Sequence, residues 1–252
     1  MFCPDTIGYG ELAAEAYDLD KSVGRSFGDV EFYRANLMNH GGPVLEAGVG
    51  NGRVLVPLTR AGLSVAGFDA SPQMLACCQR NLARHGLSAS VWQDRFETFA
   101  APPGQGAVIL PAGTFQLITS DASVSAFLGR SHKVLKPGGL LIFDLDSPAE
   151  LSAPEPRTRV WTCPDGGTIT LTETPSGIDQ ARRVVRFSHA YHRSGGAREP
   201  LSQHEDFALR WWTIGEMVAR LNAEGFRCRE IIAGYGDRCR AADGITVLAT
   251  AC

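Results

Sequence analysis

The sequence has few lysines and no surplus of positive charge. Lysine supplies three of the 24 basic residues, and the formal net charge is −3 over 252 residues. A partner bound mainly through its phosphates needs concentrated Lys and Arg, so this balance argues against nucleic acid. The sequence also lacks an apolar run long enough to span a bilayer and an initial basic segment followed by an apolar one. We therefore expect a cytoplasmic protein that binds neither nucleic acid nor a membrane.

Cysteine pairs at metal-binding spacing are missing as well. The seven cysteines include no C-x-x-C pair, which argues against structural zinc, and their odd number argues against a disulfide framework. We expect reduced thiols and no metal. With 44% hydrophobic and 20% charged residues, the composition is that of a globular protein with a sizeable core.

The patterns along the chain predict a doubly wound α/β fold. Residues 1–42 read as two helices, the second of which begins near Asp29 as its N-cap. Apolar strands then alternate with helices, which implies a parallel sheet with right-handed crossovers. The expected strands are residues 43–47, 64–68, 89–92, 115–119 and 140–145. The expected helices are residues 53–61, residues 71–86 and a helix that carries Val124, Phe127, Leu128 and Leu135.

Residues 157–212 interrupt this alternation. Their pattern predicts an antiparallel meander with strands at 159–163, 168–174, 182–191 and 203–212 and turns at 164–167, 175–177 and 194–196. A helix capped by Thr213 with Glu216 follows and ends at Gly225, before two strands at 226–233 and 245–249. The chain is thus expected to divide into residues 1–42, an α/β domain of residues 43–156 and 213–252, and an inserted segment of residues 157–212.

Glycines and acids gather at the ends of the expected strands. Residues 46–52 read EAGVGNG, where glycines let the backbone approach a ligand and the next helix directs N–H groups to the same place. Asp69 ends the second strand, where a carboxylate can accept both hydroxyls of a ribose. Asp94 follows the third strand, where it can accept a hydrogen bond from an adenine amino group. Each acid alone is commonly a solvated loop residue, but their recurrence along one sheet edge indicates a ligand crevice.

Residues 46–52 resemble the (E/D)-x-G-x-G-x-G motif of class I S-adenosylmethionine-dependent methyltransferases. Residues 68–74 (FDASPQM) resemble the second motif of that family, residues 135–139 (LKPGG) the turn before its fifth strand, and residues 209–226 the late helix of its small-molecule branch. Asn51 replaces a frequent Thr or Ser, and Asn suits a turn before a helix. The resemblance implies a seven-stranded, mostly parallel sheet in the order 3-2-1-4-5-7-6, with strand 7 antiparallel.

The resemblance also implies S-adenosylmethionine as cofactor and N-terminal helices that act as a lid over its methionine part. Plain packing is the alternative role of those helices. The implied cofactor-binding residues are Tyr17, Arg25, Glu46, Gly48, Gly50, Asn51, Asp69, Ala70, Met74, Asp94, Arg95, Phe96, Ser120 and Asp121.

Two other classes of protein share a glycine turn. A nicotinamide-dependent oxidoreductase would show G-x-G-x-x-G with an acid about 20 residues later. Arg53 and Leu55 stand where the third glycine of that pattern would fall, so the sequence disfavours it. A non-catalytic nucleotide-binding module of the same fold is the other alternative.

The methyl acceptor is expected to be a small molecule, methylated on nitrogen or oxygen. Nucleic-acid methyltransferases of this fold carry an Asn/Asp-Pro-Pro-aromatic motif or a Pro-Cys nucleophile, and residues 119–123 (TSDAS) hold neither. The inserted segment is expected to cover the acceptor site. An acceptor that starts protonated needs a base, and the candidates on this segment are His189, Tyr191, His192 and His204. Alternatively, its apolar residues pack against the main domain or form a homodimer interface.

Overall fold

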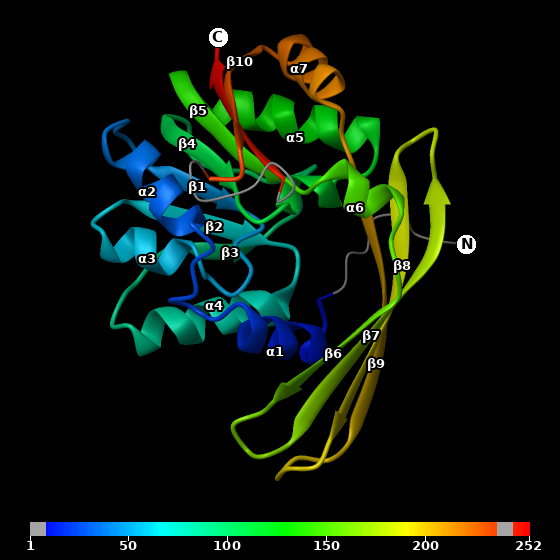
Figure 1. The fold of residues 1–252 in the computed structure, drawn as a ribbon. Helices are drawn as coiled ribbons and strands as arrows, with labels where there is room; N and C mark the ends of the chain where they lie inside the picture. The colour runs from blue at the N-terminus through cyan, green and yellow to red at the C-terminus, as the bar shows by residue number, and fades with distance from the viewer. Residues whose placement is uncertain (1–8, 236–243) are drawn as a thin grey trace.

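The computed structural model describes residues 9–235 and 244–252, most of which surround a seven-stranded sheet (Figure 1). Its strands are β1 (Val44–Ala47), β2 (Val65–Asp69), β3 (Val91–Gln93), β4 (Gln105–Leu110), β5 (Leu135–Leu145), β10 (Phe226–Ala233) and β11 (Ile245–Ala251). They lie in the order β3-β2-β1-β4-β5-β11-β10, in which β11 is antiparallel to β5 and the first five pair in parallel. The predicted doubly wound class and strand order are confirmed.

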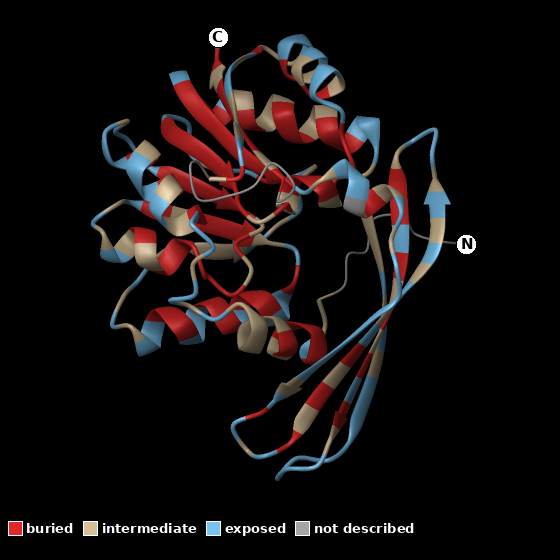
Figure 2. Ribbon diagram, in the orientation of Figure 1, coloured by how far each residue is buried: buried red, intermediate tan, exposed pale blue. Residues whose placement is uncertain are grey.

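Helices cover both faces of this sheet. One face carries α2 (Asp29–Met38), α3 (Leu55–Arg60) and α4 (Pro72–Arg84), and the other carries α5 (Asp121–Val134) and α7 (Ile214–Ala223). Tyr33 and Leu55 are fully buried on the first face, and Phe127 and Met217 on the second. Each such apolar side chain contributes about 1.5–3 kcal/mol. Figure 2 shows the central strands as a buried layer between the helices, whereas the edge strands β3 and β10 are more exposed. Among the described residues, no helix has the length and apolar character needed to cross a membrane.

The fourth strand is Gln105–Leu110, and the predicted strand at residues 115–119 is wrong. All six residues of β4 are buried, and β4 pairs with β1 and β5. Phe115 lies instead in a 3-10 helix, η1 (Thr114–Leu117), where its ring stacks on Phe143 with centroids 4.5 Å apart. A strand buried on both faces shows no alternation, and β-branched and aromatic residues favour strands, so periodicity favoured the wrong segment.

Three smaller predictions also differ from the structure. Gly28 is the N-cap of α2, with φ 95°, and Asp29 is the first helical residue. Leu135 begins β5 instead of lying on a helix. Thr213 does cap α7, because its hydroxyl accepts the Glu216 N–H at 3.3 Å, but the Glu216 carboxylate binds Arg210 at 2.8 Å. The predicted capping box is therefore half-formed.

The segment after β5 forms a second, antiparallel sheet. Following the short helix α6 (Pro148–Ser152), the strands β6 (Arg157–Thr162), β7 (Thr168–Asp179), β8 (Val184–Ser194) and β9 (Leu201–Arg210) pair in chain order. The predicted turn at 175–177 is wrong, since β7 pairs with β8 through it and the register shifts between Pro175 and Gly177. Such an irregularity accommodates proline within a strand.

Helix α1 (Glu11–Asp20) lies between the two sheets (Figure 1). Leu12 and Ala16 pack against Leu171 and Tyr191 of the second sheet. Ala14 packs with Met74 and Cys77 of α4 in the main domain. Arg193 of β8, which is 1% exposed, pairs with Glu15 of α1 and with Asp165 at 2.6 Å. Through these contacts, α1 packs against both the antiparallel sheet and the main domain.

Candidate active site

The turn after β1 brings three glycines to the carboxyl edge of the main sheet. Gly48, Gly50 and Gly52 have φ values of 73°, 54° and 80°, which favour glycine. A Cβ at Gly48 would lie 2.5 Å from Thr114 Cγ2. Within residues 9–235 and 244–252, a Cβ at Gly50 would meet only Tyr17 Cε1, at 4.0 Å, so Gly50 borders open space there. The turn is tightly packed on one side and leaves room for a ligand at Gly50.

Asp69 connects the end of β2 to this turn. Its Oδ2 accepts the Gly50 N–H at 2.9 Å, and its Oδ1 accepts the Ser71 N–H at 2.9 Å. Burial raises the pKa of Asp69, and these two backbone hydrogen bonds oppose the rise. Each carboxylate oxygen keeps a second lone pair, so Asp69 can still accept hydroxyl groups of a ligand.

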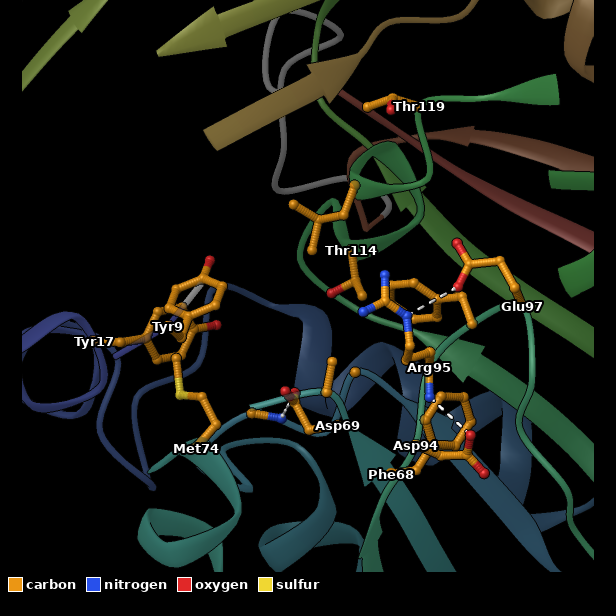
Figure 3. A pocket seen from close by; sticks show the side chains of 15 residues that line it. Tyr9, Tyr17, Phe68, Asp69, Met74, Asp94, Arg95, Glu97, Thr114 and Thr119 are labelled. Carbon is orange, nitrogen blue, oxygen red and sulfur yellow. Dashed lines mark hydrogen bonds and ion pairs between the residues drawn. The ribbon is translucent and has the colours of Figure 1, made fainter. Parts of the chain in front are cut away.

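A first cavity, of about 160 Å³, opens between the glycine turn and the ends of β2 and β3 (Figure 3). Phe68, Met74 and Phe96 supply apolar walls, and Asp69 and Asp94 supply carboxylates. Asp94 Oδ1 accepts the Arg95 N–H and the Thr98 hydroxyl, both at 2.9 Å, which fixes its orientation. Glu97 adds a third carboxylate to the lining. A slot with apolar walls and separated acids suits a nucleoside.

A second cavity, of about 220 Å³, lies between α1, the loop after β4 and the antiparallel sheet. Four residues line both cavities: Tyr9, Tyr17, Thr114 and Leu117. The carboxylates of the second cavity are Asp20, Asp146, Glu173 and Glu205, and its basic side chains are Lys21, Arg159 and His189. Its aromatic rings include Trp161, Tyr191 and Phe207. The two cavities are therefore neighbours that differ in their chemistry.

Tyr9 and Tyr17 stand where the cavities meet. Their rings lie 5.9 Å apart at 83°. Burial raises the pKa of Tyr17 to about 12 and that of Tyr9 well above its usual value. Both phenols are thus protonated near neutral pH and can donate hydrogen bonds.

Comparison with known proteins identifies a methyltransferase domain. Residues 44–139 match a family model described as a methyltransferase domain. The matched segment contains the glycine turn, Asp69 and Asp94. Residues 44–139 of the chain are therefore a methyltransferase domain, and a solved S-adenosylmethionine-dependent methyltransferase shares the fold.

Curated relatives of this methyltransferase are distant. A Bacillus subtilis protein, YqeM, named as a methyltransferase, is 25% identical over 197 residues, 78% of each chain. A Geobacillus protein with a similar name is 24% identical over 130 residues, which are 48% of this chain and 53% of the relative. The chain thus spans about half the length of the Geobacillus relative.

Solved structures share the fold over nearly the whole chain. A methyltransferase from Clostridium acetobutylicum has a TM-score of 0.77 at 15% identity and covers 94% of this chain and 97% of its own. The sugar N-methyltransferase KedS8 from Streptoalloteichus has a TM-score of 0.76 at 22% identity, and the match covers 100% of this chain and 98% of KedS8. CalS10, an amino pentose methyltransferase from Micromonospora echinaspora, was solved with S-adenosylmethionine bound. Its TM-score is 0.70 at 19% identity, and the match covers 98% of this chain and 99% of CalS10.

The first cavity fits the cofactor of this family. Gly50 leaves open space where a larger residue would place its side chain, and Asp69 retains free lone pairs at the same end. Nine of the residues predicted from the sequence line this cavity: Tyr17, Gly48, Gly50, Asp69, Ala70, Met74, Asp94, Arg95 and Phe96.

Two predicted cofactor residues lie behind the cavity wall. Asn51 Nδ2 donates to Asp18 at 2.8 Å and to the Lys21 carbonyl at 2.9 Å, so it holds the end of α1. Glu46 is 3% exposed, and its Oε2 lacks a hydrogen-bond partner among the described residues. Burial raises the pKa of Glu46 to about 8. Both side chains are buried, and neither lines the first cavity.

Three other predicted cofactor residues lie outside both cavities. Arg25 is half-exposed and pairs with Asp20 at 3.7 Å. Ser120 caps α5 by accepting the Ser123 N–H. Asp121 pairs with Arg210 at 2.8 Å and with Arg220 at 2.9 Å. Thr114, Leu117 and Thr119 line the first cavity where Ser120 and Asp121 were expected to do so. The reason is that the chain after β4 turns into η1.

The catalytic candidates divide between the faces of the antiparallel sheet. His189 and Tyr191 line the second cavity. His192 and His204 are exposed on the opposite face, so the structure does not support them as catalytic residues. Alternation along β8 and β9 separates these two sets, but it does not say which face meets the main domain.

Sequence reasoning also missed residues that the fold brings to the site. Tyr9 precedes α1 and carries no motif. Glu173 lies on β7 opposite His189, and Glu205 lies on β9 on its other side. Alternation would have placed Glu173 on the same face as Leu171, which is the one available signal for it.

Proposed function

We propose that this methyltransferase transfers a methyl group from S-adenosylmethionine to a nitrogen of a small, polar amine. The carrying observation is the second cavity, which meets the cofactor cavity at Tyr9, Tyr17, Thr114 and Leu117. Carboxylates and aromatic rings on its walls attract a cation, as an ammonium group is. KedS8, which shares the fold, is a sugar N-methyltransferase, and this supports nitrogen over oxygen.

When bound, S-adenosylmethionine supplies an electrophilic methyl group on a sulfonium. Asp69 would hold the ribose hydroxyls and Asp94 the adenine amino group, while Phe68, Met74 and Phe96 enclose the base. Residues 9–21 close the site from the side, because α1 packs on both sheets. The chain's task is then to hold the amine in line, remove a proton from it and exclude water.

Different segments of the chain line the two cavities. The walls of the first cavity come mainly from residues 48–119. The antiparallel sheet contributes nine residues to the second cavity: Arg159, Trp161, Leu171, Glu173, His189, Tyr191, Glu205, Phe207 and Leu209. We infer that residues 157–212 determine the acceptor, while residues 43–146 determine cofactor affinity.

Calorimetry with S-adenosylmethionine, S-adenosylhomocysteine, NAD and NADP tests the cofactor assignment. The two sulfur nucleotides should bind at micromolar levels and the dinucleotides should not. Dinucleotide binding without sulfonium binding would contradict the proposal and favour an oxidoreductase. Binding of both sulfur nucleotides without methylation of amines or alcohols would favour a non-catalytic module.

A further inference from the structure

Three polar side chains form one row across the antiparallel sheet. His189 of β8 lies opposite Glu173 of β7 on one side and opposite Glu205 of β9 on the other. All three line the second cavity. Directly opposed residues on neighbouring strands have Cβ atoms about 4.5–5.5 Å apart, so the imidazole lies between two carboxylates.

The His189 ring is buried and packs between two aromatic rings. It is 7% exposed, stacks on Phe207 with centroids 5.1 Å apart at 20°, and meets the edge of Tyr191 at 6.1 Å. Its Nε2 lies 3.0 Å from Glu173 Oε2, but the two groups are not aligned as a hydrogen bond. The carboxylate therefore favours a proton on Nε2, which leaves the other ring nitrogen, Nδ1, as the atom that can accept a proton.

Tyr9, Tyr191 and Glu205 also line this cavity, but each already holds its proton or accepts a hydrogen bond. Burial raises the pKa of both Tyr191 and Tyr9, so these phenols hold their protons. Glu205 Oε1 accepts the Gly10 N–H at 2.6 Å and also binds Gln203, so it anchors the segment before α1. His189 is the one imidazole among the described residues that line this cavity, beside Lys21 and the carboxylates Asp20, Asp146 and Glu173.

We propose that His189 is the general base for the amine acceptor and that Glu173 is its positioning residue. The inference rests on the proposed function and adds the path of the proton. The bound ammonium, R–NH₃⁺, gives one proton to the imidazole, which leaves R–NH₂ with a lone pair for the methyl group and an imidazolium beside the Glu173 carboxylate. Charge is conserved, because one cation replaces another. The imidazolium then loses its proton to solvent.

The sign of the pH dependence follows from the groups that face His189. Glu173, Glu205 and Tyr191 lie beside it on the antiparallel sheet, and Arg159 of β6 acts on Glu173. Tyr9, Asp20, Lys21 and Asp146 line the same cavity from the main-domain side. A Glu173 carboxylate stabilises the imidazolium, so Glu173→Gln should let the ring lose its proton at lower pH. The acid limb of the kcat/KM profile should then move to lower pH by roughly one unit or more.

The test compares Glu173→Gln, His189→Gln and a control, His192→Gln, which is on the same strand but on the exposed face. The acceptors are primary amino sugars with the amine at carbon 2, 3 or 4, and the donor is S-adenosylmethionine. His189→Gln should lower turnover at neutral pH by roughly 10²–10⁴-fold. The defect should shrink at high pH, where the amine is deprotonated in solution, and His192→Gln should match the native protein. A His189→Gln defect of equal size at every pH would overturn the proposal.

Imidazole NMR of the full chain labelled with ¹⁵N-histidine gives a readout that needs no acceptor. The His189 signal, identified by its loss in His189→Gln, should titrate at lower pH in Glu173→Gln and at the native pH in His192→Gln. An unchanged His189 midpoint in Glu173→Gln would overturn the role of Glu173. If no amine is methylated by the native protein, the proposed function fails, and a shifted midpoint still supports the Glu173–His189 pair.

Discussion

The backbone N–H of Gly50 donates to Asp69 Oδ2 at 2.9 Å, which joins the glycine turn after β1 to the end of β2. One carboxylate thereby shapes the turn and faces the first cavity. If the same residue binds the ribose of the cofactor, as we propose, its removal should affect affinity much more than folding.

Asp69→Ala should weaken binding of S-adenosylhomocysteine by at least tenfold. A charge-assisted hydrogen bond contributes roughly 1.5–3 kcal/mol, and the ribose offers two hydroxyls. Calorimetry measures the loss, with circular dichroism and thermal melting as controls for folding. Native affinity in a folded Asp69→Ala protein would show that the ribose binds elsewhere.

Gly52→Ala should destabilise the fold more than Gly62→Ala. Both glycines have positive φ, 80° and 89°, so each substitution adds backbone strain of roughly 1–2 kcal/mol. A Cβ at Gly52 would also lie 2.8 Å from Cys78 Sγ, whereas a Cβ at Gly62 would have no atom of the described residues within 4 Å. Overpacking of this kind costs roughly 1–3 kcal/mol more. Equal losses in urea unfolding would show that the clash relaxes without cost.

Glu46→Gln should change how stability depends on pH. Burial raises the pKa of Glu46 from 4.5 to about 8, so the folded protein binds a proton that the unfolded chain releases. Its contribution to the free energy of unfolding is therefore complete below pH 4.5 and is lost as the pH rises to about 8. Native protein without cofactor should lose stability relative to Glu46→Gln over this window, by an amount on the order of a few kcal/mol. Parallel curves from urea unfolding at pH 5, 7 and 9 would contradict this.

Much of the fold could be predicted from local patterns. The glycine turn, the acids after β2 and β3 and the capped helix α7 each have a local signal, and nine predicted residues line the cofactor cavity. The fourth strand could not be assigned by periodicity, because β4 is buried throughout while Phe115 packs in a 3-10 helix. The acceptor site depends on how two sheets meet. Sequence alternation cannot show that His189 faces the main domain or that Tyr9 reaches both cavities.

Tyr191→Ala should leave cofactor affinity within a few-fold of the native value. Tyr191 lines the second cavity and packs on α1, but it is absent from the lining of the first. Calorimetry with S-adenosylhomocysteine tests this, and sedimentation of the same variant tests the homodimer alternative. Full activity with dissociation to monomers would make the antiparallel sheet an assembly element and place the acceptor elsewhere.

The most direct measurement is transfer of tritium from methyl-labelled S-adenosylmethionine to matched acceptors. Each primary amino sugar is paired with the sugar that carries a hydroxyl at the same carbon, and the products are identified by mass spectrometry. The account predicts label on the nitrogen of at least one amine and none on its hydroxyl partner. Label on the hydroxyl compounds alone, with the amines untouched, would contradict it.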